Sequence, residues 1–189
     1  MIQEIDLNTI LKSKIISNAI ENNEFKGFKE DYLVIHYLLS IWKPKHIFEI
    51  GTNTGNGCRI MHNASPDSKI STLDIMIECG HLCPPIVKKY TGDSMNYNFE
   101  NHYPIDCWFI DGHHVYENVY HETNEAIKSG AKYIIYHDAD IEEVTKGILD
   151  SFNDLGVASE YNFYRVVNTS YVYSSSGKNI TRILYVEKK

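Results

Sequence analysis

Apolar residues recur along this chain of 189 residues with two different spacings, and the spacing changes from one segment to the next. Over 4–22 and over 29–42 they recur every three or four positions, which predicts two amphipathic helices near the N-terminus. Pro44 follows the second segment and ends its helical pattern. Short apolar runs typical of strands come next, at 46–50, 69–74, 87–91, 105–110 and 133–137. Helical spacing returns between and after these runs, at 54–63, 114–129 and 142–155.

Strands that alternate with helices predict an α/β fold, in which right-handed crossovers place helices on both faces of a mostly parallel sheet. The C-terminal part breaks this alternation, because 160–167 and 181–187 read as two strands joined by the Ser/Gly-rich loop 174–177. We expect these two strands to form an antiparallel hairpin at the end of the sheet. The sequence therefore predicts a Rossmann-like, doubly wound, seven-stranded sheet with additional N-terminal helices.

The charge and the composition of the chain indicate which kinds of molecule it can bind. The net charge is −7 and the lysines are scattered, so no basic stripe is available to neutralise the phosphates of a nucleic acid. No apolar run reaches the length of a membrane helix, and 1–6 carries no signal-peptide core. The four cysteines suit reduced thiols, which predicts a cytoplasmic protein. The missing basic stripe favours a small molecule as the substrate. Monomer and homodimer both stay open.

Cys79 and Cys83 have a spacing that would suit half of a zinc site. The other half is missing from the nearby sequence, and Pro84 and Pro85 follow directly. A loop without zinc is therefore the preferred interpretation of this segment.

The junction between the first predicted strand and the next helix carries the most information. It reads Phe48-Glu49-Ile50-Gly51-Thr52-Asn53-Thr54-Gly55-Asn56-Gly57. A glycine turn between a strand and a helix N-terminus presents backbone N–H groups to a nucleotide-like ligand, although an ordinary βα turn also favours glycine. A dinucleotide fingerprint requires G-x-G-x-x-G, whereas here the first gap is three residues long and Ile60 stands where the third glycine belongs.

The pattern Glu49-x-Gly51-x-x-x-Gly55-x-Gly57 instead resembles the first motif of the class I S-adenosylmethionine (SAM) methyltransferases. Two later strand ends fit the second and third motifs of that family. Asp74 lies about 20 residues past the turn, where an acid can accept both ribose hydroxyls. Gly92-Asp93-Ser94 ends the following strand, where a carboxylate and the backbone can contact the adenine. Either acid can equally serve as a helix cap or turn residue.

The resemblance implies a set of cofactor contacts along these strand ends. They are Glu49, Gly51, Thr52, Asn53, Gly55, Asp74, Ile75, Gly92, Asp93, Ser94 and Asp111.

Two further strand ends would carry the chemistry. Residues 105–117 contain Ile110-Asp111-Gly112-His113-His114-Val115-Tyr116, and the strand at 133–137 ends in His137-Asp138. These stretches resemble the I-D-G-D-H-S-Y signature, and its His-Asp companion, of a subgroup with small-molecule and sugar O-methyltransferases, related to the catechol type. The resemblance covers about residues 30–140.

In that subgroup the matching residues hold a divalent cation, which implies Asp111, His137 and Asp138 as metal ligands here. The resemblance also implies His114 as general base, since the pKa of histidine lies near neutrality. The chain departs from the subgroup at His137, where catechol-type enzymes have an oxygen ligand. Imidazole would favour manganese, iron or zinc over magnesium, so the presence of a metal and its identity stay open. His113 replaces the second acid of the signature and receives no role.

The sequence thus predicts a SAM-dependent methyltransferase that methylates an oxygen of a small hydroxylated molecule. We expect a single domain over 1–189, with N-terminal helices over 1–43, a cofactor-binding core over 44–156 and a C-terminal hairpin over 157–189. Two alternatives remain: a SAM-binding or regulatory module without catalysis, and an NAD-dependent oxidoreductase. The acceptor itself is not readable from the sequence.

Overall fold

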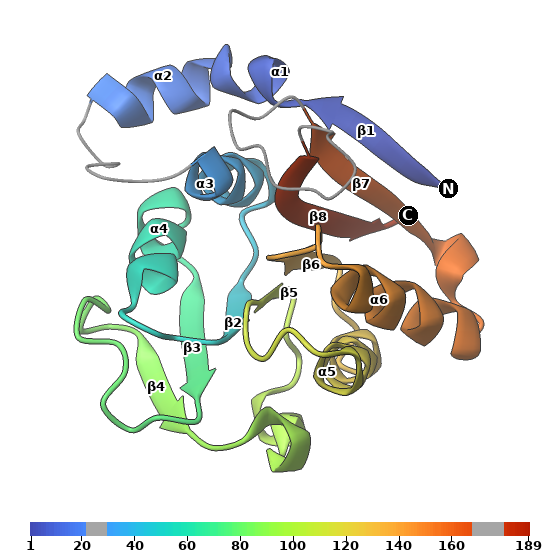
Figure 1. The fold of residues 1–189 in the computed structure, drawn as a ribbon. Coiled ribbons are helices and arrows are strands. Elements are labelled where there is room, and N and C mark those ends of the chain that lie inside the picture. Colours follow the sequence, from blue (N-terminus) through green and yellow to red (C-terminus); the bar gives the residue numbers. More distant parts are fainter. Residues whose placement is uncertain (22–29, 168–179) are drawn as a thin grey trace.

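One mixed β-sheet runs through the molecule, with helices on both of its faces (Figure 1). The structure is a computed structural model that describes residues 1–21, 30–167 and 180–189. The strands in chain order are β1 (Ile2–Asp6), β2 (His46–Ile50), β3 (Lys69–Asp74), β4 (Lys88–Thr91), β5 (Cys107–Ile110), β6 (Tyr133–Tyr136), β7 (Tyr161–Val167) and β8 (Ile180–Lys188). The α-helices are α1 (Leu7–Leu11), α2 (Lys14–Glu21), α3 (Glu30–Trp42), α4 (Asn56–Ala64), α5 (Tyr116–Lys128) and α6 (Glu142–Asp154). Short 3₁₀ helices are η1 (Ser94–Asn96), η2 (Phe99–His102) and η3 (Ala158–Glu160).

The strand order explains where a site can form. Within the described residues it is β1-β7-β8-β6-β5-β2-β3-β4. β2 pairs in parallel with both β3 and β5, and the parallel pairing continues to β4 on one side and to β6 on the other. β8 is antiparallel to both β6 and β7. The carboxyl ends of β2 to β6 therefore meet at one edge, and the predicted α/β fold with an antiparallel C-terminal hairpin is confirmed. The predicted loop 174–177 lies outside the described residues.

The secondary structure at the N-terminus differs from the prediction. We expected one helix over 4–22, but the chain forms β1, which pairs in parallel with β7, and then the two short helices α1 and α2. The sheet thus has eight strands in place of the predicted seven. Asp6 marks the change, because its carboxylate accepts a hydrogen bond of 2.8 Å from the backbone N–H of Asn8 and caps α1. The backbone of β7 pairs with residues 2–6 and so favours a strand there. The spacing of apolar residues along the chain does not report such pairing between distant segments.

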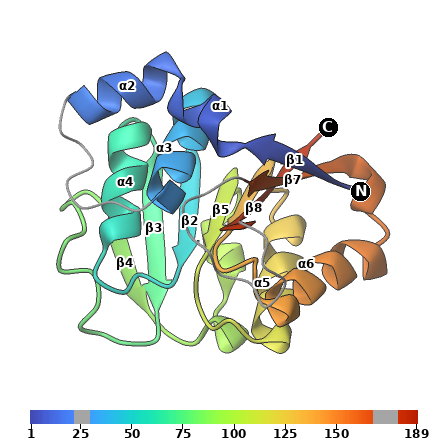
Figure 2. The ribbon, with the colours of Figure 1, turned by 45° about the horizontal axis from the view of Figure 1, so that its top comes forward.

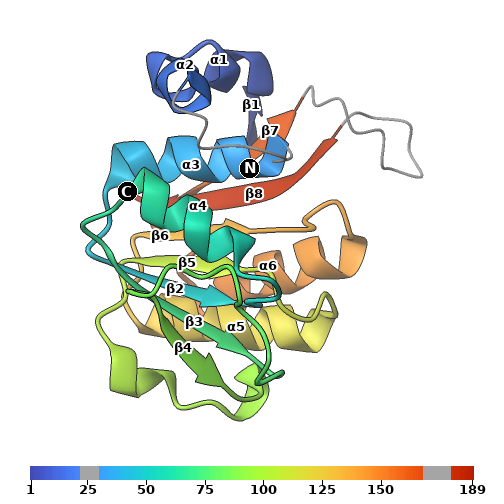
Figure 3. The same ribbon diagram turned by 90° about the vertical axis from the view of Figure 1, so that its left-hand side faces the viewer.

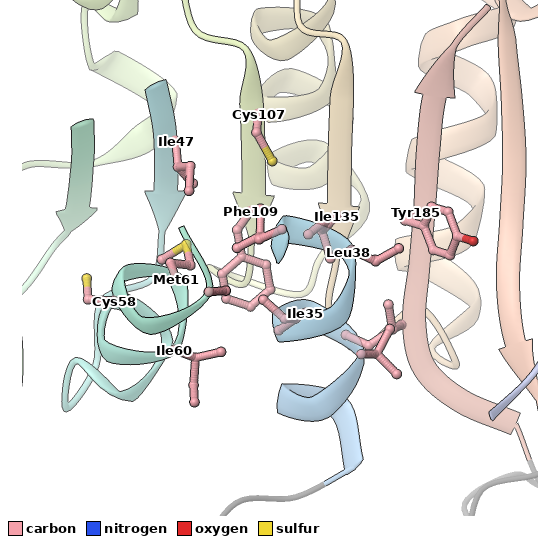
Figure 4. Packing of buried hydrophobic residues seen from close by; sticks show 14 of the residues in the cluster. Ile35, Leu38, Ile47, Cys58, Ile60, Met61, Cys107, Phe109, Ile135 and Tyr185 are labelled. Carbon is pink, nitrogen blue, oxygen red and sulfur yellow. The ribbon is translucent and has the colours of Figure 1, made fainter. Parts of the chain in front are cut away.

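Two apolar layers cover the sheet. α3 and α4 lie on one face, and α5 and α6 lie on the other (Figures 2 and 3). On the first face, Leu38 of α3 and Met61 of α4 pack in one cluster with Phe109 and Ile135 of the central strands (Figure 4). On the second face, Trp108 is fully buried, and its indole N–H donates a hydrogen bond of 2.9 Å to Ser129 Oγ. The central strands are therefore buried on both sides, which explains their continuous apolar runs.

The crossover after β3 has no α-helix. Residues 75–87 form an irregular segment, on which Ile75, Met76, Ile77 and Ile86 are all exposed. This segment is anchored to the turn that precedes α4, since Gly80 N–H donates to the Asn53 carbonyl over 2.7 Å. Among the described residues, no helix combines the length and the apolar character that crossing a bilayer requires.

Candidate functional site

The glycine turn between β2 and α4 packs tightly against the rest of the protein. Gly51 and Gly55 have φ angles of 92° and 93°, which L-residues with side chains rarely adopt. A Cβ atom at Gly51 would lie 2.0 Å from the Asp111 carbonyl oxygen, and one at Gly55 would lie 2.7 Å from the Cys83 nitrogen. A Cβ at Gly57 would lie 2.1 Å from Glu49 Oε1. From the sequence, these glycines were expected to allow the approach of a ligand, but the fold already requires them for its own packing.

Glu49 lies behind this turn and is buried, with an exposed fraction of 1%. Its Oε2 atom accepts hydrogen bonds from Cys58 Sγ over 2.9 Å and from Thr72 Oγ1 over 2.5 Å. Thr72 also lies 2.6 Å from the hydroxyl of Thr52. Burial raises the pKa of Glu49 to about 8, against the opposing effect of these hydrogen bonds. The carboxyl group therefore connects β2, α4 and β3 from the interior.

Asp74 and Asp93 end β3 and follow β4, as the sequence predicted, and both make local hydrogen bonds. The carboxylate of Asp74 accepts from the backbone N–H groups of Asn53 and Met76, each over 2.9 Å. The carboxylate of Asp93 accepts from the backbone N–H of Met95 over 3.0 Å and so caps η1. Carboxylate oxygens have further lone pairs, so these bonds leave both groups able to accept from a ligand.

Ser94, next to Asp93, is buried and donates a hydrogen bond of 2.6 Å to Oε1 of Glu122 on α5. Sequence reasoning missed Glu122. An acid on the apolar stripe of a predicted helix is the only signal that the sequence offers for it. Of the other predicted cofactor contacts, Ile75 is exposed, while Gly92 packs close to the ring of Tyr97.

Four predicted side chains meet at the carboxyl ends of β5 and β6. Asp111 Oδ1 lies 3.4 Å from His114 Nε2 and 3.2 Å from His137 Nδ1. Asp138 Oδ2 lies 3.2 Å from the same His114 nitrogen and 3.0 Å from the same His137 nitrogen. They converge because β5 and β6 are parallel neighbours, with Ile110 opposite Tyr136 at their ends. The backbone at Asp138 has a φ of 50°, which turns the chain directly after His137.

Two residues from distant elements complete this cluster. Asp31, buried on α3, places its Oδ2 atom 3.4 Å from His137 Nε2. Arg182 of β8 places a guanidinium nitrogen 3.2 Å from Asp138 Oδ1. Neither residue carried a recognisable signal in the sequence, since only the fold brings α3 and β8 to this edge.

The cluster balances three carboxylates against two imidazoles and one guanidinium. Burial lowers the pKa of His137, but its close contacts with Asp111, Asp138 and Asp31 outweigh this effect and raise the pKa to about 12. The contact with Asp111 likewise raises the pKa of His114. The pKa of Asp111 is lowered, because its two histidine partners outweigh the effect of its burial. Asp111, His114 and His137 thus depend on one another for their ionisation.

The same atoms suit a divalent cation. His114 Nε2 and His137 Nδ1 are buried within ion-pair distance of the carboxylates, but they lack a hydrogen bond of good geometry. One ligand atom each from Asp111, His114 and Asp138 lie within 4.8 Å of one another. The ring of His137 is held from behind by a carboxylate, as is usual for histidines that bind metals. Cys79 and Cys83 are free thiols and belong to no such group among the described residues.

No family model matches the sequence, and no match was found among curated proteins. Solved structures do match. An O-methyltransferase from Bacillus cereus in complex with SAH has a TM-score of 0.65 at 17% identity, over 97% of this chain and 90% of that chain.

Two further structures have the same fold. TomG from Streptomyces achromogenes, an O-methyltransferase of tomaymycin synthesis in complex with SAM, gives a TM-score of 0.64 at 14% identity over 94% of this chain and 91% of its own. The MycE methyltransferase of mycinamycin biosynthesis, in complex with Mg and SAH, gives 0.60 at 17% identity over 98% of this chain and 55% of its own. At these identities the likeness establishes the fold alone, which this chain shares with these methyltransferase structures.

The packing of the glycine turn yields a first prediction. We expect Gly51→Ala to destabilise the protein by more than about 3 kcal/mol, because the added Cβ meets the Asp111 carbonyl as well as an unfavourable φ. The matched control is Gly130→Ala, where φ is 79° but no atom lies within 4 Å of the new Cβ. That variant is expected to lose only about 1 kcal/mol. Urea denaturation of both variants measures the difference, and equal losses would contradict the close approach at Gly51.

A second prediction concerns the buried carboxyl group of Glu49. Its pKa is about 8 in the folded protein against an ordinary value of 4.5, so the unfolded chain releases this proton first as the pH rises. This group therefore lowers the free energy of unfolding between those two pKa values, by up to about 1.4 kcal/mol per pH unit. Glu49→Gln is expected to remove that slope, whereas Glu78→Gln, at an exposed position, is expected to keep it. Denaturation over a pH series measures both, and an unchanged slope in Glu49→Gln would refute the assignment.

Proposed function

We propose that this protein is a SAM-dependent methyltransferase that methylates an oxygen of a small hydroxylated molecule. The observation that carries the proposal is the carboxylate–imidazole cluster directly beside the glycine turn. Asp111 donates its backbone N–H to the Ile50 carbonyl over 2.9 Å, and its own carbonyl packs on Gly51. A cofactor held on the turn would therefore have its reactive part next to the cluster. Structures of similar fold in complex with SAH or SAM support this choice of cofactor.

The reaction we propose is a direct transfer. The acceptor oxygen attacks the methyl carbon of SAM, the bond from that carbon to sulfur breaks, and SAH leaves. The hydroxyl proton goes to His114 in its neutral form, which is present above the raised pKa of this residue. His114 lies at the rim of the cluster with its side chain 36% exposed. The glycine turn and Asp74 would hold the cofactor, so that alignment rather than covalent catalysis provides most of the rate enhancement.

The cluster also fits a divalent metal, and we include one in the proposal. Asp111, His137 and Asp138 would hold it, and His114 would lie beside it as the proton acceptor. When bound, such a cation lowers the pKa of a coordinated hydroxyl and orients it. The similar MycE structure contains Mg. The nitrogen donors of this chain favour manganese or another transition metal over magnesium.

The proposal also includes the class of acceptor and the cellular compartment. A small-molecule acceptor is supported by the net charge of −7 and by the MycE structure that contains mycinamycin VI. We place the reaction in the cytoplasm, because all four cysteines are free thiols. The single-domain organisation and a homodimer stay predictions.

Calorimetric titration tests the cofactor and the metal separately. We expect SAH to bind with a Kd in the micromolar range, and Mn²⁺ to bind more tightly than Mg²⁺. Asp138→Asn is expected to weaken Mn²⁺ binding by more than about tenfold and to leave SAH binding unchanged. Asparagine tolerates the positive φ at this position, and Asp140→Asn is the matched control outside the cluster. Absence of SAH binding to the wild type would refute the methyltransferase proposal.

Catalysis by His114 is tested by a paired substitution. We expect His114→Gln to lower kcat by about 10²- to 10⁴-fold with little change in the affinity for SAM, because it removes the proton acceptor. His113→Gln changes the neighbouring exposed histidine and is expected to keep nearly full activity. Release of SAH, measured with a panel of catechols and sugars, gives both rates. A protein that binds SAM but shows no turnover with any acceptor would favour the regulatory module.

A further inference from the structure

Glu122 is a buried carboxyl group that the proposed reaction does not use. It lies on α5 with an exposed fraction of 0%. Among the described residues no lysine, arginine or histidine forms an ion pair with it. Its Oε2 atom is buried without a hydrogen-bond partner, and burial raises its pKa to about 7. Burial of such a group is costly, so its position requires an explanation.

The carboxyl group lies between two segments of the candidate site. Its Oε1 atom accepts the hydrogen bond from Ser94 Oγ over 2.6 Å, which fixes it behind the end of β4. On the other side, a Cβ atom at Gly112 would lie 3.4 Å from the same oxygen. Glu122 therefore lies behind both the expected adenine segment, 92–94, and the segment that follows Asp111.

The hydrogen bond determines what Ser94 can offer to a ligand. A serine hydroxyl has one proton to donate and two lone pairs that accept. Ser94 gives its proton to Glu122, so that its oxygen can only accept a further hydrogen bond. The neighbouring Asp93 is occupied in capping η1, with Oδ1 bonded to Met95 N–H and Oδ2 bonded to the Asn96 side chain over 3.2 Å.

We propose that Glu122 is a positioning residue that sets the base specificity of the cofactor site through Ser94. By taking the hydroxyl proton of Ser94, it makes this side chain an acceptor that suits a purine with an amino group at C6. A purine with a carbonyl oxygen at C6 presents an acceptor to the same atom and is disfavoured. This inference rests on the proposed function, because it requires the adenine to bind at 92–94.

The test compares two ligands that differ at that one position. They are SAH and S-inosylhomocysteine, its 6-oxo counterpart, each titrated by calorimetry at about pH 8.5, where Glu122 is ionised. Wild type is expected to prefer SAH. Glu122→Gln is expected to lower the ratio of the two affinities by about tenfold, because the amide can donate to Ser94 Oγ and release its proton. Glu125→Gln, on the same helix, is the matched control and is expected to keep the wild-type ratio.

The ratio of the two affinities distinguishes a role of Glu122 in base specificity from a merely structural role. Loss of a merely structural contact would weaken both ligands equally, and an unchanged ratio in Glu122→Gln would overturn the inference. Ser94→Ala provides a second variant if Glu122→Gln does not fold. It is expected to lower the ratio as well, and in the double variant the Glu122 substitution should have no further effect. Absence of SAH binding to wild type would refute the proposed function, and the inference with it, whereas a normal SAH affinity with an unchanged ratio refutes the inference alone.

Discussion

The close approach of the glycine turn to the end of β5 is the constraint on which the candidate site depends. Gly51 donates its backbone N–H to the Leu73 carbonyl over 2.9 Å, and Asp111 donates to the Ile50 carbonyl over the same distance. His137 continues the series, donating to the Ile110 carbonyl over 3.0 Å. These bonds join the ends of β3, β2, β5 and β6 in one line. Because Gly51 has no Cβ atom, the turn and the Asp111 backbone can occupy adjacent positions, and every side chain that follows these strands is placed accordingly.

The charged side chains at this edge of the sheet stabilise one another through ion pairs. A buried carboxylate or imidazolium is costly alone, but the cluster around His137 pairs each of its charges with a neighbour of opposite sign. Glu49 and Glu122 lie deeper and have no cationic partner among the described ion pairs, and burial raises the pKa of each. Ionised groups thus lie at the ends of β5 and β6, and more readily protonated carboxyl groups lie deeper in the protein.

Local sequence signals predicted the central sheet well and its edges less well. The strands expected at 46–50 and 69–74 have those bounds in the structure, because buried parallel strands carry unbroken apolar runs between turn residues. The prediction of a helix over 4–22 was wrong at its start, because Ile5 fits the helical spacing although it belongs to β1. Pairing with β7, a strand more than 150 residues away, decided between the two.

The sequence by itself determined the fold class, the glycine turn, and which four polar side chains, Asp111, His114, His137 and Asp138, follow the ends of β5 and β6, because each depends on the order of residues within one strand and its following loop. Tertiary structure alone decided which residues surround them. Asp31, Arg182 and Glu122 reach the site from three different elements and have no local pattern that marks them. The physical reason is that periodicity and motifs report interactions between neighbours in the chain. Ion pairs and hydrogen bonds between distant elements form only after the sheet and its helices have packed.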